Sequence, residues 1–269
     1  MYSSISRSSS QTDGEQPLLN LYWILPWEIR QRICTFFVEG TYNNEVMVRR
    51  KGRGNLSFLV RHSTGSLSYD WIEDPTLIQL SPDRVGVDIS KEILQEYYKT
   101  RIFKVGHHEL ECIQTLLETA CFGLTICPAE HIRRLHLQFQ PFGSAQSLDS
   151  TLMARENRML RQALRCLALL VSSRTIIEVH LVMPQDVFNS EEGGVLIDDI
   201  AALVFRLVEL VNTLRKTGVN INFLIEGGWD ERGGIRVYSD SIPSLDGCVT
   251  QLKSLAVDAI IGTGLETSH

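Results

Sequence analysis

The feature of this sequence that most constrains its fold is a regular alternation of helical and extended segments over residues 108–225. Apolar residues at helical spacing predict three helices, and short apolar alternations between them predict three strands. The predicted helices span about 108–121, 151–172 and 196–216, and the predicted strands are Ile132–Phe139, Ile176–Val182 and Ile221–Ile225. Strands that alternate with helices of this length are typical of βαβ units. The sequence therefore predicts an α/β fold with a small, mainly parallel sheet.

The spacing of these strands leaves two architectures open. The three strands begin about 44 residues apart. A period of this size fits a repeat protein, in which each unit buries its apolar face only against its neighbours. Ordinary crossovers between parallel strands give a similar spacing. The body of the protein is therefore expected to be either a small α/β domain or a repeat-like stack.

A short amphipathic helix is predicted before this body. From Pro26, apolar residues recur at helical spacing, and Gly40 follows the last of them. The apolar positions are Ile29, Ile33, Phe36 and Phe37. Because amphipathic helices normally bury their apolar stripe internally, we expect Ile29, Ile33 and Phe37 to cover the protein's own core. Trp27 is large and flanked by charge, and we expect it to be an exposed anchor for a partner.

A β-hairpin and a second helix are predicted to follow. Val46–Arg49 and Leu56–Val60 have alternating character and are joined by the glycine-rich segment Lys51–Gly54. An i, i+4 row of apolar residues predicts a helix over Asp83–Thr100, and Ile102–Val105 is strand-like.

Three regions are therefore expected along the chain. Residues 1–17 are rich in serine, glutamine and charge without periodicity, which predicts a disordered leader. Residues 18–106 form a helical region with a hairpin insertion, and residues 107–269 form the α/β body.

Composition and charge argue against several classes of function. The net charge of −6 and the pI near 5.7 make nucleic acid an unlikely partner, because affinity for phosphate backbones comes largely from clustered lysines and arginines. Six cysteines spread along a long chain predict reduced thiols rather than a disulfide framework. The N-terminal segment lacks an apolar signal region, and no apolar stretch is long enough to span a bilayer. We expect a cytoplasmic or nuclear protein without a membrane partner.

Three segments of the chain resemble a known family. Leu25-Pro26-Trp27-Glu28-Ile29-Arg30-Gln31-Arg32-Ile33 resembles the Leu-Pro-x-Glu-Ile-Arg-x-x-Ile opening of the F-box-like two-EXR domains that are abundant in filamentous fungi. Residues 87–103 are similar to the next landmark of that family, with matches at Glu92, Tyr97, Tyr98 and Phe103, although the arginine expected before Glu92 is absent. Ile132–Leu137 resembles the strand that commonly follows.

This resemblance covers roughly residues 25–140. It implies F-box-like helices split by an inserted β-hairpin and followed by a variable α/β region. It implies no established activity, because members of the family are mostly uncharacterised. F-box domains dock their Leu-Pro helix on the adaptor subunit of a ubiquitin ligase, so a substrate adaptor of an SCF-type ubiquitin ligase is one function that the resemblance suggests.

Two groups of residues are candidate contacts for a protein partner. The first group is Pro26, Trp27 and Arg30, at the start of the predicted N-terminal helix. The second is a row of arginines at helical spacing that includes Arg158, Arg161 and Arg165. Such a row fits an acidic partner, although surface helices ordinarily present charged faces to water.

Four residues of metal-ligand type lie in one short segment of the sequence. Cys121, Cys127, His131 and His136 lie within sixteen residues of one another. In the usual zinc patterns, paired ligands are separated by about two to five residues, and this spacing fits none of them. We therefore predict no metal site and no bound cofactor.

An enzymatic function depends on carboxylates near the ends of the predicted strands. Asp186, Glu226 and Asp230 lie where open α/β sheets place ligands, and converging carboxylates would bind a metal or share a proton. Acidic loops are more often only solvated, and the chain has no phosphate-binding loop, dinucleotide fingerprint or nucleophile elbow. The sequence therefore favours a non-enzymatic protein-interaction protein over the ubiquitin-ligase adaptor, and the adaptor over an enzyme.

Overall fold

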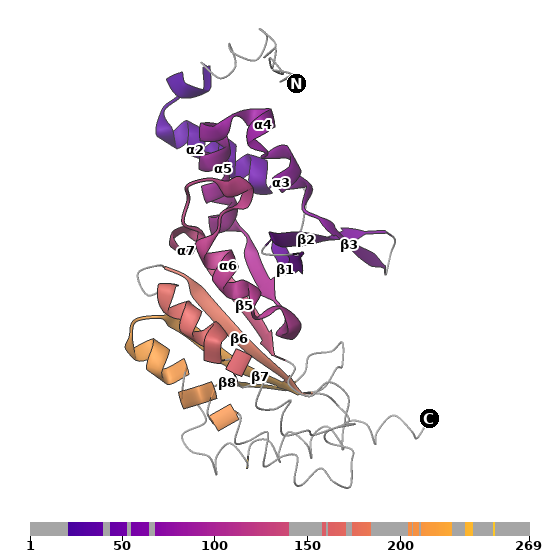
Figure 1. The fold of residues 1–269 in the computed structure, drawn as a ribbon, viewed down its shortest axis with the longest axis vertical. Coiled ribbons are helices and arrows are strands. Elements are labelled where there is room, and N and C mark those ends of the chain that lie inside the picture. Colours follow the sequence, from indigo (N-terminus) through magenta and orange to yellow (C-terminus); the bar gives the residue numbers. More distant parts are fainter. Residues whose placement is uncertain are drawn as a thin grey trace, which may run out of the picture.

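A mixed β-sheet is the central element of the computed structural model (Figure 1). The structure describes residues 21–39, 44–52, 55–64, 68–139, 158–159, 161–170, 174–183, 204–205, 207–209, 211–227, 235–238 and 250. The strands in this part of the chain are β1 (Glu45–Lys51), β2 (Asn55–Ser63), β3 (Tyr69–Glu73), β4 (Ile102–Val105), β5 (Arg134–Phe139), β6 (Ile176–Met183), β7 (Asn220–Gly227) and β8 (Ile235–Tyr238). They lie in the order β3-β2-β1-β4-β5-β6-β7-β8.

The middle of this sheet is parallel and its two edges are antiparallel. β1, β4, β5, β6 and β7 pair in parallel. The hairpin formed by β1 and β2 continues into β3 at one edge, and β8 pairs antiparallel with β7 at the other. The predicted α/β fold with a mainly parallel sheet is confirmed, as is the predicted hairpin, in which Gly52 adopts the positive φ of 70° that its turn requires.

The helices begin and end at residues whose backbone preferences suit those positions. They are α2 (Trp27–Glu39), α3 (Pro75–Gln79), α4 (Pro82–Val85), α5 (Val87–Thr100), α6 (Cys112–Glu118) and α7 (Pro128–His131). The Asp74 carboxylate caps α3 by accepting a hydrogen bond of 2.9 Å from the backbone N–H of Thr76. No helix within the described residues is both long enough and apolar enough to cross a membrane.

Two helices differ from their predicted extents. The single helix predicted over Asp83–Thr100 is wrong, because Gly86 adopts a φ of 82° and separates α4 from α5. The helix predicted over about 108–121 is shorter, since a 3-10 turn at His107–Glu109 precedes α6 and an extended Thr119 ends it. The apolar periodicity therefore located both helical regions but not the breaks within them.

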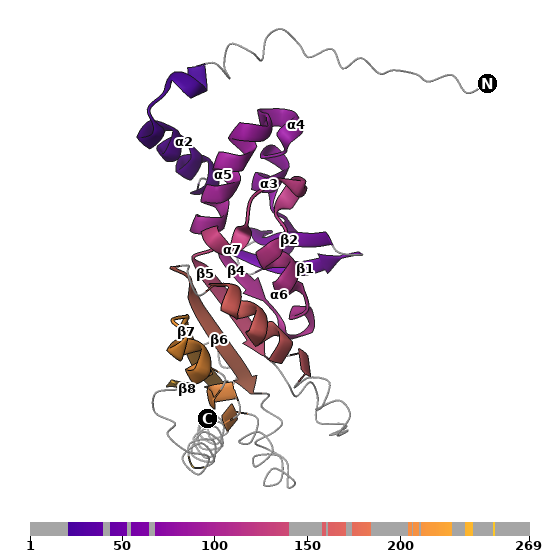
Figure 2. The ribbon, with the colours of Figure 1, turned by 60° about the vertical axis from the view of Figure 1, so that its left-hand side comes forward.

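The crossovers between the parallel strands pass over one side of the sheet. β4, β5, β6 and β7 follow one another across the sheet in sequence order. Right-handed crossovers that always step in the same direction place every connecting segment on the same face. Figures 1 and 2 show α6, α7 and the helical residues 161–166 and 211–216 on this side. We call the opposite side, over which the described part of the chain places no crossover helix, the open sheet face.

Burial along the strands follows this one-sided arrangement. The residues that face the helices are apolar and at most 1% exposed, namely Phe103, Leu135, Leu137, Ile177, Val179, Ile221 and Phe223. Alternate residues on a strand point to opposite faces, so their neighbours line the open sheet face. Lys104, His136 and Glu178 are half-buried there, and Arg134 and Asn222 are exposed. The open sheet face is therefore polar around these residues, whereas Val182 and Leu224 at the carboxyl ends of β6 and β7 are apolar and buried on the same face.

The sheet also crosses the predicted boundary between residues 106 and 107. β4, on the N-terminal side of that boundary, pairs with β5 on its other side and with β1 of the hairpin. The hairpin insertion and the body therefore share one hydrogen-bonded sheet.

A fully buried ion pair holds the hairpin against the start of β4. Arg101 follows α5, Asp74 follows β3, and their side chains lie 3.7 Å apart with no exposed surface. The Tyr97 hydroxyl donates to Asp74 at 2.9 Å, and Arg101 donates to the Thr76 hydroxyl at 3.1 Å. Buried charges are tolerated only when they are paired and hydrogen-bonded, and these contacts meet that requirement.

Replacing Asp74 with asparagine should therefore strongly destabilise the fold. Asp74→Asn keeps a helix-capping side chain but removes the negative charge beside the buried Arg101 guanidinium. Breaking a buried pair by removing one partner costs about 3–5 kcal/mol, and we expect the free energy of unfolding in urea to fall by that amount. The control is Glu111→Gln, which breaks an exposed pair with Arg50 and should change the free energy of unfolding far less. Equal costs for the two variants would contradict this account.

The buried imidazole of His107 makes stability dependent on pH. Burial, with a smaller contribution from His108, lowers the pKa of His107 from 6.5 to about 4. Because the folded-state pKa lies below the unfolded one, the unfolded chain binds more protons in this interval, and stability is lost as the pH falls from 6.5 to 4. In His107→Gln, the urea midpoint should change less with pH than in the wild type, whereas the exposed-site control His62→Gln should retain the wild-type slope.

Candidate functional site

The outward side of α2 carries a continuous apolar surface. Phe36 is 80% exposed and Trp27 is 47% exposed, while Ile29, Ile33 and Phe37 are between 37% and 42% exposed. Ile29, Ile33, Phe36 and Phe37 share one side of the helix, and we call these four residues the α2 outer face. Trp27 lies seven residues before the buried Cys34 and therefore falls on the side of α2 that faces α5. Exposed apolar patches on protein surfaces often belong to interaction sites, so this face is a candidate.

The opposite side of α2 packs on α5 through both polar and apolar residues. Arg30 forms an ion pair of 2.7 Å with Glu92 of α5, and the Thr35 hydroxyl donates to Glu96 at 3.2 Å. Cys34 and Val38, on the same side as Arg30, are buried. These contacts orient the helix so that the row at positions 30, 34 and 38 faces inward.

The expectation that Ile29, Ile33 and Phe37 cover the protein's own core is therefore wrong. Helical periodicity correctly groups them on one stripe, but the neighbouring stripe makes the contact with α5. Arg30 and Thr35 lie on the neighbouring stripe and donate hydrogen bonds to the carboxylates of Glu92 and Glu96, so that stripe faces α5. Sequence reasoning had no means of knowing which carboxylates α2 would meet.

The three candidate contacts at the start of α2 have different surroundings. Pro26 is exposed, and its carbonyl accepts the backbone N–H groups of Ile29 and Arg30 at 3.0 and 3.1 Å. The Arg30 guanidinium lies 5.6 Å from the ring centre of Trp27 and 4.8 Å from that of Trp23. Arg30 is also paired with Glu92, so its position is fixed within the chain and it stacks on the rings of Trp23 and Trp27. Trp27 nevertheless remains 47% exposed.

The arginine row lies elsewhere in the molecule. Arg158, Arg161 and Arg165 are all exposed on the helical segment between β5 and β6. Figure 1 shows this segment against β6, whereas α2 lies beside α5 at the other end of the described chain. The structure does not bring the two groups of candidate contacts together.

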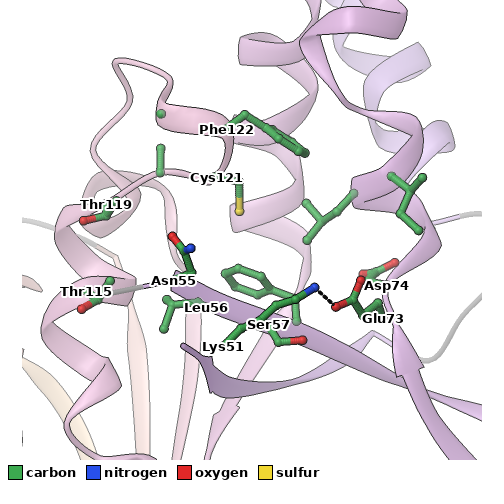
Figure 3. Close-up of a pocket in the computed structure, with 15 residues that line it drawn as sticks. Lys51, Asn55, Leu56, Ser57, Glu73, Asp74, Thr115, Thr119, Cys121 and Phe122 are labelled. Carbon is green, nitrogen blue, oxygen red and sulfur yellow. Dashed lines mark hydrogen bonds and ion pairs between the residues drawn. The ribbon is translucent and has the colours of Figure 1, made fainter. Parts of the chain in front are cut away.

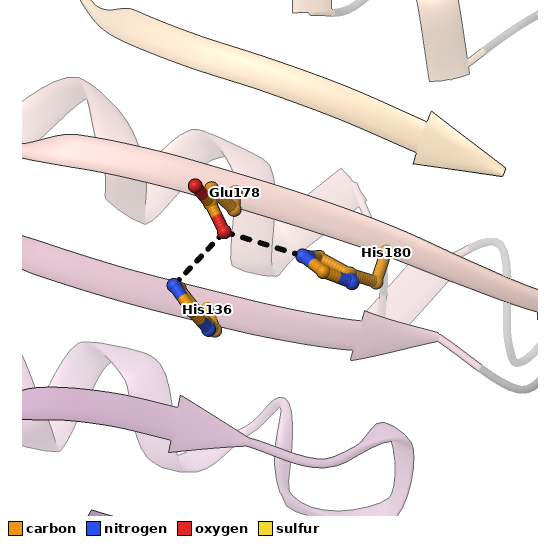
Figure 4. Close-up of side chains that lie close together, drawn as sticks. All are labelled: His136, Glu178 and His180. Atoms are coloured by element: carbon orange, nitrogen blue, oxygen red, sulfur yellow. Dashed lines mark hydrogen bonds and ion pairs between the residues drawn. The ribbon is translucent and has the colours of Figure 1, made fainter. Parts of the chain in front are cut away.

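A cluster of two histidines and a glutamate lies on the open sheet face. His136 of β5 and Glu178 of β6 are directly opposite each other in the strand register, and His180 is two residues beyond Glu178. His136 Nε2 is 2.9 Å and His180 Nε2 is 3.4 Å from Glu178 Oε2 (Figure 4). The two imidazole rings stack with their centres 5.6 Å apart. Burial lowers the pKa of His136, and the attraction of Glu178 opposes that shift.

The sequence contained His136 but assigned it different neighbours. Among the described residues, the three that can present metal-ligand atoms together are His136, Glu178 and His180. Cys121 instead packs beside the Tyr98 hydroxyl, and Cys127 is exposed near the carbonyl of Leu117. Spacing along the chain missed the cluster because its members come from two strands 42 residues apart in register.

A cleft of about 680 Å³ lies between β2, α3 and the segment after α6. Its lining includes Cys121 and Phe122, and Lys51 and Glu73 form an ion pair at its side (Figure 3). Burial raises the pKa of the Cys121 thiol to about 11, so the thiolate that a nucleophile requires is scarce at neutral pH. Burial therefore argues against Cys121 as an activated nucleophile in this cleft.

The predicted carboxylate site cannot be assembled from the described residues. Asp186 and Asp230 lie outside them, and of Glu226 only the backbone, within β7, is described.

Comparisons with protein families, curated proteins and solved structures found no match to this chain. The two surfaces that the described structure offers for function are therefore the α2 outer face and the open sheet face.

The cysteines should differ in reactivity according to burial. Cys127 is exposed, Cys34 is buried, and burial raises the pKa of Cys121 to about 11. Because the thiolate is the reactive form, iodoacetamide near neutral pH should label Cys127 well before Cys34 and Cys121. Peptide mass spectrometry over time measures the order, and labelling in urea should remove the difference. Equal rates in the folded chain would contradict the described burial.

Proposed function

We propose that this chain is a non-enzymatic protein-interaction protein that binds a partner through the α2 outer face. The observation that carries the proposal is the orientation of α2, which packs on α5 through Arg30, Cys34, Thr35 and Val38 and leaves the apolar residues of the α2 outer face exposed. Leaving such a stripe in water forgoes about 1.5–3 kcal/mol for each large apolar side chain that could be buried. A partner that covers the stripe recovers part of this free energy.

The composition of the α2 outer face supports this role. Interface energy is concentrated in a few buried aromatic anchors surrounded by residues that exclude water. Phe36 and Phe37 are the aromatic residues of the face, and Ile29 and Ile33 lie on the turns of the helix before them. A groove that accepts one side of an amphipathic helix is the partner surface that this pattern fits.

The contacts beneath α2 support binding without rearrangement. Glu92 accepts hydrogen bonds from Arg30 and from the Tyr22 hydroxyl, both at 2.7 Å. These bonds fix α2 on α5 before any partner arrives. A preorganised helix loses less conformational entropy on binding, so more of the contact energy contributes to affinity.

A more specific candidate partner is the F-box-binding adaptor subunit of an SCF-type ubiquitin ligase. The resemblance of residues 25–33 to an F-box-like opening suggests this partner. The observation that favours it is the exposure of the apolar side of this Leu-Pro helix, since a docking helix must keep that side free. The chain would then serve as a substrate adaptor, with its remaining surface available to a substrate.

The general proposal is tested by comparing proteins that copurify with the full chain and with variants. Ile33→Asp and Phe36→Ser should each remove the partner, because a charge or a truncated side chain leaves the partner's groove unfilled. The matched control is Ile78→Ser on α3, which changes an apolar residue of 50% exposure away from α2. If every copurifying protein is retained by both α2 variants, the α2 outer face is not the interface.

The specific partner is tested with the purified adaptor subunit in isothermal titration calorimetry. The wild-type chain should bind in a one-to-one complex, and Phe36→Ser should weaken binding at least about tenfold, as expected for an interface anchor. Ile78→Ser should bind like the wild type. Absence of wild-type binding would exclude the ligase adaptor while leaving the general proposal to the copurification experiment.

A further inference from the structure

The cluster on the open sheet face has the composition and geometry of a metal-binding site. Its ligand atoms, one each from His136, Glu178 and His180, all lie within 4.8 Å of one another. Figure 4 shows the three side chains converging from two neighbouring strands. Two imidazoles and one carboxylate are a ligand set that proteins use for zinc and other first-row transition ions.

We infer that His136 Nε2, Glu178 Oε2 and His180 Nε2 bind one divalent transition-metal ion, with Zn²⁺ as the representative ion. Zinc bonds to nitrogen and oxygen of about 2.0–2.2 Å place the ligands of a tetrahedral site roughly 3.3 Å apart. The separations of 2.9 Å and 3.4 Å from Glu178 Oε2 to the two histidine nitrogens lie close to that value, and the two nitrogens lie within 4.8 Å of each other. Small side-chain movements are therefore sufficient to coordinate the ion.

The sheet holds these ligands in place from both sides. His136 and Glu178 are register partners on adjacent parallel strands, and His180 follows on the same face of β6. β5 and β6 are inner strands, paired with β4 and β7 on their other sides. A site built on paired strands maintains its geometry better than one built on loops, so the ligands are preorganised.

The cluster is accessible and has room for a further ligand. The side chains of His136, Glu178 and His180 are 23%, 39% and 22% exposed. Three protein ligands leave the fourth tetrahedral position to water or another group, as in zinc sites that do not have a closed ligand shell. The nearby Lys104, opposite His136 in the register, is paired with Glu45 at 2.8 Å, so its positive charge is largely balanced.

The chemistry of the cluster selects among cations. Imidazole nitrogen suits Zn²⁺, Ni²⁺, Cu²⁺ and Co²⁺, whereas Ca²⁺ and Mg²⁺ require mainly oxygen ligands. The site also lies on the sheet, apart from the α2 outer face, so this inference does not depend on the proposed function.

Calorimetric titration of the chelator-treated full chain with Zn²⁺ tests the inference. We expect one ion to bind per chain, and Zn²⁺ to raise the melting temperature because it binds the folded state. Glu178→Gln and His180→Gln should each weaken Zn²⁺ binding at least about tenfold, since each removes one of three ligands. The control is His62→Gln, an exposed histidine on β2, which should bind like the wild type.

Cobalt absorption identifies the ligands independently of affinity. Co²⁺ in the wild type should give the visible bands of a four-coordinate nitrogen and oxygen site, without the near-ultraviolet thiolate band that cysteine ligands produce. Glutamine is nearly the same size as glutamate, so Glu178→Gln changes the packing little. The melting temperature of this variant without metal shows whether the variant protein is folded. No wild-type binding at micromolar Zn²⁺, a thiolate band, or unchanged affinity in both folded variants would each overturn the inference.

Discussion

The ion pair between Arg101 and Asp74 connects the junction of β3 and α3 to the junction of α5 and β4. Asp74 ends the hairpin extension and caps α3, whereas Arg101 joins the end of α5 to the start of β4. Because both charges are fully buried, each requires the other in place. The pairing of β1 with β4 and the orientation of α5 both depend on this junction. α5 in turn supplies Glu92 and Glu96, which orient α2.

The two candidate functional surfaces arise from different constraints. The α2 outer face is exposed because α2 packs on α5 through its opposite side. The open sheet face carries no crossover helix in the described part of the chain because successive crossovers in one direction place their helices on the other side. One surface is apolar and is the proposed protein contact, whereas the other carries the His136, Glu178 and His180 cluster. A protein contact and an ion therefore do not compete for the same residues.

The residues that resemble the F-box-like landmarks contact one another in the fold. Arg30 of the first landmark pairs with Glu92 of the second, and Tyr97, Tyr98 and Phe103 form one buried aromatic group with ring centres 5.7 to 6.0 Å apart. These residues hold the helices on the sheet. Family membership remains an expectation from the sequence, and the contacts give these residues a structural role in any case.

Local patterns in the sequence determined the α/β class, the parallel strands, the hairpin and the start of α2, because periodicity and turn chemistry act over a few neighbouring residues. They also placed His136 on a strand. The break at Gly86, the antiparallel β8 and the outward direction of the α2 stripe were decided only in the tertiary structure. So was the meeting of His136 with Glu178 and His180, since strand register and helix orientation depend on contacts between segments far apart in sequence.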